Sequence, residues 1–388
     1  MKITVVGAGN AGCLSALHLG WFTRRFENVE IELVYDPSIP PEPVGQATIL
    51  DPPRLLYSAT PWNWYNNKLH ATIKTGVLYE GWGKKNEKVF HQFPADRVAI
   101  HLCPSTMQEY ILKSEFFTTK EQGVSNIEGI DSDYIIDCRG RPTDFAGYGQ
   151  LLNPINACIV GEPNWEVNDP WTRSVATPDG WTFVIPAKKE APAHKNSIGY
   201  LYNSSITGKE EATENFKGLF DVNVSRYLTF NNYIAKEPVI NDRIFLNGNR
   251  LFFLEPLEAT ALQTYLYMVR LITDAIIYKD ANDYSKPIKT MREVKDEIIS
   301  FIKKSEKFIL WHYQYGSKYD TMFWKYAKSL PFNVDDEFSS CLDYANDKNW
   351  YDLKPTEYDG DPDASTLYGI WNPYSFKNWY NGMHYKYE

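Results

Sequence analysis

The sequence predicts an α/β protein with a parallel sheet near its N-terminus, a mixed β layer in the middle and a helical, aromatic-rich C-terminal part. Three observations support this fold class. Strand, glycine turn, helix and strand patterns follow one another within residues 1–37. Short strand-like pieces alternate with turns over residues 155–240, and long helical patterns follow residue 258. A strand–helix–strand succession implies a parallel sheet.

The N-terminal elements are the most clearly marked. "KITVV" (2–6) is a short buried-strand pattern, and "CLSALHLGWF" (13–22) places apolar residues at helical spacing. "VEIELVYD" (29–36) is a second strand pattern, and "DYIIDCRG" (133–140) is typical of another core strand that ends in a tight turn. The first two strands, with the helix between them, form a βαβ unit and imply a parallel sheet.

The rest of the chain is predicted more coarsely. Residues 50–130 are rich in aromatic and turn residues. The stretch after Glu258 runs without glycine or proline to about residue 279 and predicts a long helix, and a second helix is expected at about 291–313. From about residue 331 we expect an irregular, aromatic cap. The predicted units are a body over residues 1–285 and a C-terminal cap region over residues 286–388.

Composition limits the possible functions. Of the 388 residues 43% are hydrophobic and 23% charged, as in ordinary globular proteins, whereas aromatic residues are abundant. The net charge of −9 argues against a general nucleic-acid binder. The five cysteines never form a C-x-x-C pair, which excludes a zinc site built on paired cysteines and suits a reducing compartment. Since no apolar run approaches the roughly 18 residues that a membrane helix needs, we expect a soluble, cytoplasmic protein.

The turn after the first strand has the spacing G-x-G-x-x-G. Gly7 permits the tight turn, Gly9 lets the backbone approach a pyrophosphate, and Gly12 allows close packing of helix and strand. The helix N-terminus favours the phosphate charge. This context predicts dinucleotide binding, and Asp36, at the end of the second strand, is the candidate partner of the ribose. The pattern alone does not separate FAD from NAD.

The stretch "LFFLEPLEATAL" (251–262) places Glu255 and Glu258 in an otherwise apolar run. A buried carboxylate must be paired, hydrogen-bonded or used in chemistry. Glu258 could simply favour the helix N-terminus, although the backbone N–H groups of Thr260 and Ala261 could hold a small anion there. Lys74 lies within a strand pattern, where a lone lysine is usually a solvated edge residue.

Taken together, these motifs resemble the flavin-dependent, tryptophan-type halogenases, most of all the viral members encoded by marine cyanophages. "GAGNAG" (7–12) resembles the family's dinucleotide loop, and "VGQATI" (44–49) its flavin strap. "IKTGVLYEGW" (73–82) resembles the segment that carries the catalytic lysine. "GWTFVIP" (180–186), followed by "GYLY", resembles the W-x-W-x-I-P signature. "GNRLFFLEPLEATAL" (248–262) resembles the halide block, and "FILWHYQYGSKYDTMFW" (308–324) a late helix.

The resemblance implies a Rossmann-like FAD-binding domain of the flavin monooxygenase and halogenase type. It implies that reduced FAD and O2 oxidise chloride, bromide or iodide to hypohalous acid, which Lys74 and Glu258 deliver to an indole or phenol. The halide would be held at Thr260 and Ala261. The implied FAD-binding residues are Gly7, Gly9, Asn10, Ala11, Gly12, Asp36, Ile39, Val44, Ala47, Asn249 and Leu262, with Trp181, Phe183, Ile185 and Pro186 near the flavin.

Several positions depart from the family pattern. Phe183 replaces the second tryptophan of the signature, Gln46 replaces a glutamate of the strap, and Ala259 and Ala261 replace serine and glycine of the halide block. A separate flavin reductase is expected because the chain has one dinucleotide fingerprint. Bromide or iodide could be preferred over chloride because they are easier to oxidise. The natural substrate, regiochemistry and any homo-oligomeric state are left open.

Two alternatives compete with this interpretation. A flavin-dependent aromatic hydroxylase would share the dinucleotide fold but would need neither Lys74 nor the halide amides. A degenerate fold kept as a binding subunit would not bind FAD. The intact glycine loop, with both Lys74 and Glu258 present, favours the halogenase.

Overall fold

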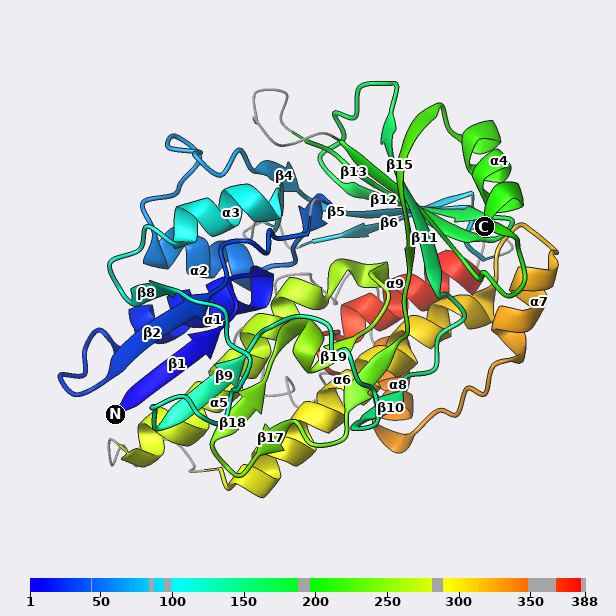
Figure 1. Cartoon of the computed structure of the whole chain (residues 1–388). Coiled ribbons are helices and arrows are strands. Elements are labelled where there is room, and N and C mark those ends of the chain that lie inside the picture. The colour runs from blue at the N-terminus through cyan, green and yellow to red at the C-terminus, as the bar shows by residue number, and fades with distance from the viewer. Residues whose placement is uncertain are drawn as a thin grey trace.

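The computed structural model describes residues 1–42, 44–83, 87–93, 99–187, 196–280, 289–347 and 368–384 (Figure 1). Its first sheet has six strands in the order β17-β18-β9-β1-β2-β8. All neighbouring pairs are parallel except β17 with β18. The predicted strands are confirmed, because β1 pairs in register with both β2 and β9. The bounds are β1 Lys2–Val6, β2 Glu30–Tyr35, β8 Thr118–Glu121, β9 Tyr134–Asp137, β17 Val239–Ile240 and β18 Ile244–Leu246.

A second, seven-stranded sheet has the order β15-β11-β14-β13-β12-β5-β6. All its pairs are antiparallel except β12 with β5, so the predicted mixed β layer is confirmed. The layer also draws two strands from the region before residue 130. Its bounds are β5 Gly76–Glu80, β6 Lys88–Gln92, β11 Ala157–Pro163, β12 Thr172–Thr177, β13 Gly180–Ile185, β14 Ser197–Tyr202 and β15 Val222–Thr229.

Two three-stranded sheets lie beside these layers. One has the order β3-β7-β4 and the other β10-β16-β19. Lys74 ends β4 and Gly76 begins β5, so the chain passes from a small sheet to the large one within three residues. The bounds are β3 Gln46–Ala47, β4 Thr72–Lys74, β7 Ala99–Leu102, β10 Tyr148–Gln150, β16 Tyr233–Ala235 and β19 Phe252–Phe253.

Helices cover the sheets. Helix α1 (Asn10–Thr23) packs against α2 (Asp51–Ala59), α3 (Pro104–Ile111) and α5 (Ala261–Asp280), and α4 (Lys209–Leu219) packs on β15. Short 3₁₀ turns, η1 (Gly248–Arg250) and η2 (Leu257–Ala259), precede α5. The predicted helix at 291–313 is confirmed as α6 (Met291–Tyr315), which starts at a capping box made by Thr290 and Glu293. Helix α7 (Met322–Ser329) follows it.

The expectation of an irregular cap after residue 331 is wrong for the described part of the tail. It contains α8 (Asp336–Asp347) and α9 (Pro373–His384), and α9 lies against β6, α6 and α8. Phe376, Trp379 and Met383 are spaced by three and four residues and are buried, which makes an amphipathic helix. In Figure 1, α6 and α9 run beneath the large sheet.

One apolar cluster contains side chains from both predicted units, from Leu14 in α1 to Trp379 in α9. The proposed boundary at residues 285–286 lies outside the described residues. Among the described residues, no helix has the length and apolarity to cross a membrane, and no group of three or more His, Cys, Asp or Glu side chains is placed to hold a metal ion. All five cysteines are buried.

Candidate functional site

The glycine loop is tightly packed on one side and open on the other. Gly7 has φ +101°, and a Cβ there would lie 2.6 Å from the carbonyl oxygen of Cys138. A Cβ on Gly12 would lie 1.7 Å from the carbonyl oxygen of Gly7, whereas a Cβ on Gly9 would meet nothing within 4 Å. The open space at Gly9, before the N-terminus of α1, fits a pyrophosphate. The buried Oδ1 of Asn10 has no hydrogen-bond partner among the described residues, so it is available to a ligand.

Asp36 lies directly after β2, at the sheet edge that carries the glycine loop. Its Oδ1 accepts hydrogen bonds from the backbone N–H of Ser38 (2.9 Å) and from the Ser38 hydroxyl (2.6 Å), which lower the pKa of the carboxyl. Ile39 is 69% exposed. Neither residue lines the cavity described next.

A cavity of about 320 Å³ lies between the glycine loop, the large sheet and η2. Most of the predicted flavin and halide residues line it, which brings together segments from five parts of the sequence. Leu262 is instead buried in α5 at 1% exposure, and Ala11 is buried in α1. Arg141 also lines the cavity and was not predicted. The predicted residues at its wall are Asn10, Val44, Ala47, Trp181, Phe183, Ile185, Asn249, Glu258, Thr260 and Ala261.

The "GWTFVIP" and "GYLY" motifs form the neighbouring strands β13 and β14. Phe183 is paired with Gly199, and a Cβ on Gly199 would lie 2.2 Å from Cζ of the Phe183 ring. Glycine is therefore required opposite this ring. Trp181 Nε1 donates to Glu255 Oε2 at 3.0 Å. Pro186 follows β13 directly.

The loop between β19 and α5 has an unusual backbone. Glu258 (φ 72°) and Ala259 (φ 53°) both occupy the left-handed region, which costs about 1–3 kcal/mol per residue without glycine and is common at functional sites. Thr260 and Ala261 follow at the start of α5. Within the described structure no residue accepts a hydrogen bond from their backbone N–H groups. These N–H groups, at the positive end of α5, are suited to a small anion.

Lys74 is buried, not solvated as a lone strand lysine usually is. Its side chain is 1% exposed, its Nζ donates to the carbonyl oxygen of Thr48 at 3.0 Å, and the Phe93 ring centroid lies 5.1 Å away. Burial lowers the pKa of this amine to about 7, against the raising effect of the Glu258 charge. Near neutral pH, Lys74 can therefore be an amine or an ammonium.

Glu258 is held by four side chains of the described structure. Its Oε1 accepts from the Tyr79 hydroxyl, from His312 Nε2 (2.7 Å) and from Trp379 Nε1 (3.2 Å). Its Oε2 accepts from Trp371 Nε1 at 3.2 Å. Burial alone would raise the pKa of Glu258, but the hydrogen bond and charge of His312, with help from His91 and Tyr79, lower it to about 2. Glu258 is thus a carboxylate at neutral pH.

Glu255 occupies a separate pocket of donors. Its two oxygens accept from the Tyr313 hydroxyl (2.7 Å), Asn153 Nδ2 (3.4 Å), Trp181 Nε1 (3.0 Å) and the backbone N–H of Leu257 (3.3 Å). Burial raises the pKa of Glu255 to about 7, although these hydrogen bonds lower it. Glu255 therefore ties the strained loop to β13 and α6, which is a structural role.

Lys74 and Glu258 interact through their charges but do not form a direct ion pair. His91 completes the cluster, because its pKa responds to Glu258, His312 and Lys74. The sequence prediction missed His91 and His312, although His312 stands inside a recognised motif. It left open which tail aromatics, Trp371 and Trp379 among them, line the site. His312, Trp371 and Trp379 are identified by their hydrogen bonds to Glu258, across more than 50 residues of sequence. His91 is identified only by the effect of the Glu258 charge on its pKa.

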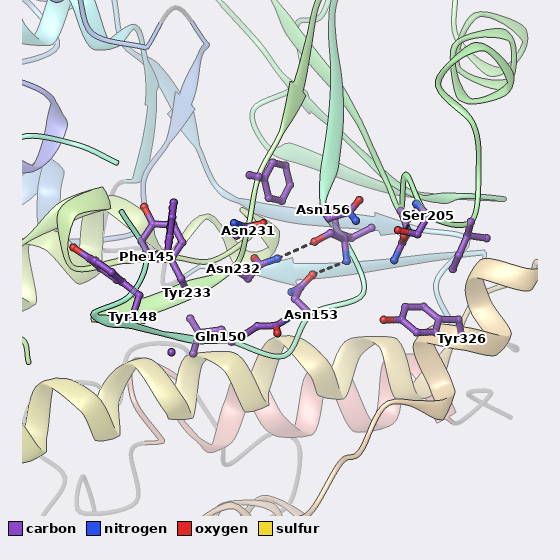
Figure 2. A pocket seen from close by; sticks show the side chains of 16 residues that line it. Phe145, Tyr148, Gln150, Asn153, Asn156, Ser205, Asn231, Asn232, Tyr233 and Tyr326 are labelled. Atoms are coloured by element: carbon purple, nitrogen blue, oxygen red, sulfur yellow. Dashed lines mark hydrogen bonds between the residues drawn. The ribbon is translucent and has the colours of Figure 1, made fainter. Parts of the chain in front are cut away.

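A second cavity of about 520 Å³ lies beyond Glu255 and is lined by amides and aromatic rings (Figure 2). Asn153 and Asn232 line it and both contact Glu255. In Figure 2 the dashed lines show the Asn153 and Asn232 amides bonded to the backbone of Ile155. These amides thus stabilise the fold of the cavity wall.

Comparisons with known proteins identify the family and the fold of this chain. Residues 2–125 and 128–384 match the tryptophan halogenase family. The tryptophan 7-halogenase KtzQ of Kutzneria sp. (strain 744) is 27% identical over 279 residues, which cover 64% of this chain and 50% of the relative, so the match spans about half of that protein. The tryptophan 7-halogenase RebH of Lentzea aerocolonigenes is 22% identical over 436 residues, with 85% of this chain and 79% of the relative covered.

Solved structures show the same fold. The lanthipeptide tryptophan 5-halogenase MibH superimposes with a TM-score of 0.78 at 16% identity, covering 98% of this chain and 85% of MibH. A tryptophan halogenase from Shewanella frigidimarina NCIMB 400 superimposes with a TM-score of 0.76 at 16% identity, covering 100% and 89%. Because the family match covers nearly the whole sequence, this chain belongs to the tryptophan halogenase family.

Proposed function

We propose that this protein is an FADH2- and O2-dependent halogenase that transfers an oxidised halide to an electron-rich aromatic ring of the indole or phenol class. One observation carries the proposal. A buried amine, Lys74, is coupled to a buried carboxylate, Glu258, which also lines the cavity that reaches Asn10 of the glycine motif. A hydroxylase would not need this pair. The family match supports the same reaction class.

The described residues fit FAD. The open space at Gly9 would receive the pyrophosphate, and the unpartnered Oδ1 of Asn10 would accept a hydrogen bond from a hydroxyl or N–H group of the cofactor. Trp181 and Phe183 would lie beside the ring system. Arg141, a cation at the cavity wall, would add charge complementarity. When bound, reduced FAD and O2 would supply the oxidising equivalents that convert halide to hypohalous acid. A separate flavin reductase would supply the reduced cofactor.

The chain's own residues would bind the halide, receive the electrophile and accept the proton. The N–H groups of Thr260 and Ala261 would hold the halide, and the strained backbone before them aims α5 at the cavity. Lys74 would receive the electrophile, as an amine that forms a haloamine or as an ammonium that donates a hydrogen bond. Glu258, ionised and fixed by its donors, would orient the electrophile and accept the proton that the ring loses.

The test is a panel of indoles and phenols with bromide, a flavin reductase and mass detection of the products. A bromine mass increment with wild type that is lost in Lys74→Ala supports the proposal. Hydroxylated product, formed with or without halide, would support the monooxygenase instead. A chain that never acquires a flavin spectrum on reconstitution would support a binding role.

The halide itself is a further part of the proposal. Bromide and iodide are easier to oxidise than chloride, so they are expected to give more product when two halides compete at equal concentration with one substrate. Predominant chlorination in that competition would contradict this preference without affecting the proposed reaction class.

A further inference from the structure

We infer that His312 is the resident counter-cation of Glu258 and that, by filling this role, it leaves the Lys74 amine unprotonated and able to take an electrophile. The inference rests on the function proposed above and concerns the same site. It assigns His312 the role of a positioning residue, because His312 acts on the electrophile through Glu258 and Lys74.

The hydrogen bonds of His312 identify its charge. Its Nδ1 lies 2.7 Å from the backbone carbonyl oxygen of Phe308, and its Nε2 lies 2.7 Å from Oε1 of Glu258. A carbonyl oxygen only accepts, and an ionised carboxylate only accepts. Both ring nitrogens must therefore carry hydrogen when Glu258 is ionised, which makes His312 an imidazolium. The side chain is fully buried, so water cannot replace either partner.

The remaining donors to Glu258 carry no charge. Tyr79, Trp371 and Trp379 approach it with neutral O–H and N–H groups. A buried carboxylate is far less costly when a cation is paired with it. Among the described groups that act on this carboxylate, the candidate cations are His312, His91 and Lys74.

His91 does not fit that role. Asn378 Nδ2 donates to the carbonyl oxygen of Phe90 (3.4 Å), which fixes the orientation of its amide, and also to His91 Nδ1 (2.8 Å). His91 Nδ1 is then an acceptor, so this imidazole is neutral, and burial lowers its pKa. The choice of cation lies between His312 and Lys74.

Geometry favours His312 over Lys74. His312 contacts the carboxylate directly, whereas the Nζ of Lys74 donates to the carbonyl oxygen of Thr48 and makes no ion pair with Glu258. One buried anion needs one cation, and a second one would be an uncompensated buried charge. With His312 protonated, Glu258 from η2 and the titratable groups that act on it (Tyr79 from β5, His91 from β6 and His312 from α6) carry no net charge together.

A free amine matters for the chemistry. The nitrogen lone pair of Lys74 would attack the halogen of hypohalous acid, forming an N–halogen bond while one amine proton leaves with the hydroxyl as water. The aromatic carbon would then take the halogen and lose its proton to Glu258, which would pass the proton to the nitrogen to restore the amine. An ammonium has no lone pair for the first step, so the charge of His312 would set the fraction of competent enzyme.

The experiment is an NMR titration of flavin-free protein with ¹³C-labelled lysine and ¹⁵N-labelled histidine side chains, in which the signals are assigned with Lys74→Arg and His312→Gln. In wild type the His312 ring should show two protonated nitrogens at pH 7.5, and the Lys74 midpoint should lie near 7. In His312→Gln the Lys74 midpoint should rise by at least about one pH unit, because Lys74 becomes the only cation for Glu258. The pH dependence of halogenation should shift in the same direction.

Trp371→Phe is the matched control, because it removes a neutral donor from the same carboxylate. The Lys74 midpoint should move much less in this variant than in His312→Gln. A neutral His312 ring in wild type, or an unchanged Lys74 midpoint in His312→Gln, would overturn the inference. If His312→Gln does not fold, the His312 ring signals can be assigned from their contacts with Trp379, whose ring centroid lies 3.6 Å away, so the wild-type spectrum still decides the question. Absence of halogenation by wild type would instead count against the proposed function.

Discussion

Replacement of Lys74 by methionine should increase the stability of the folded protein near neutral pH while abolishing the proposed chemistry. Methionine keeps a long, apolar side chain in the buried site and removes the amine. The pKa of Lys74 is lowered by burial from its ordinary 10.5 to about 7, although the Glu258 charge raises it. At 1.36 kcal/mol per pKa unit, the buried amine costs roughly 5 kcal/mol of unfolding free energy at pH 7 and below.

The sign of the stability difference between Lys74→Met and wild type follows from proton linkage. A lysine whose folded pKa is depressed contributes stability that is present above about pH 10.5 and is lost as the pH falls toward 7. Loss of the hydrogen bond to the Thr48 carbonyl offsets about 1 kcal/mol of the gain. Lys74→Met should therefore be more stable than wild type by about 4 kcal/mol at pH 7, and the difference should shrink by about 1.4 kcal/mol per pH unit at higher pH.

Urea unfolding of both proteins at pH 7, 8 and 9 would measure this difference. Lys68→Met, at an exposed lysine, is the control and should change stability by less than about 0.5 kcal/mol. Equal stability of wild type and Lys74→Met at pH 7, or a difference independent of pH, would refute the buried-amine reasoning.

Three further predictions concern the loop and the two glutamates. Gly9→Ala should keep the unfolding free energy of wild type within about 0.5 kcal/mol but should bind FAD at least about tenfold more weakly, whereas Gly12→Ala should destabilise the fold itself. Flavin titration would measure FAD binding and urea unfolding would measure stability. Unchanged FAD binding by Gly9→Ala would contradict this prediction. Because the pKa of Glu255 is raised, wild type should lose roughly 3 kcal/mol of unfolding free energy as the pH rises from 4.5 to 7. Urea unfolding should show that Glu255→Gln no longer has this pH dependence. A pH dependence that persists in the variant would contradict the prediction. Glu258→Gln should lower kcat for halogenation by at least about 100-fold and leave flavin affinity unchanged, and full activity of this variant would contradict its role.

Part of the fold could be predicted because its signals are local. The strand, glycine turn and helix at residues 2–23, and the apolar stripes of α5 and α6, follow directly from periodicity and capping residues. The tail prediction failed because α9 is short and its apolar stripe, which consists of Phe376, Trp379 and Met383, begins just after a proline. Short helices of this kind are stabilised by packing more than by sequence propensity.

In the site, too, some residues have a local sequence signal and others do not. The glycine motif, Lys74, Glu258 and the strands that face the cavity were placed by motif and resemblance. The donors that hold Glu258 could not be predicted in this way. Tyr79, His312 and Trp379 come from β5, α6 and α9, which are far apart in the sequence and meet only in the folded structure. The burial of Lys74 likewise depends on the passage of the chain from β4 to β5, which no local pattern predicts.

The most direct test of the account is bromination of an indole by wild type and by Lys74→Met, each with reduced FAD, O2, bromide and a dissolved trap for free hypobromous acid. We expect wild type to brominate the indole in the presence of the trap. We expect Lys74→Met to oxidise bromide and brominate only the trap, because the electrophile has no amine to hold it. An equal yield of bromoindole from the two proteins in the presence of the trap would contradict the account.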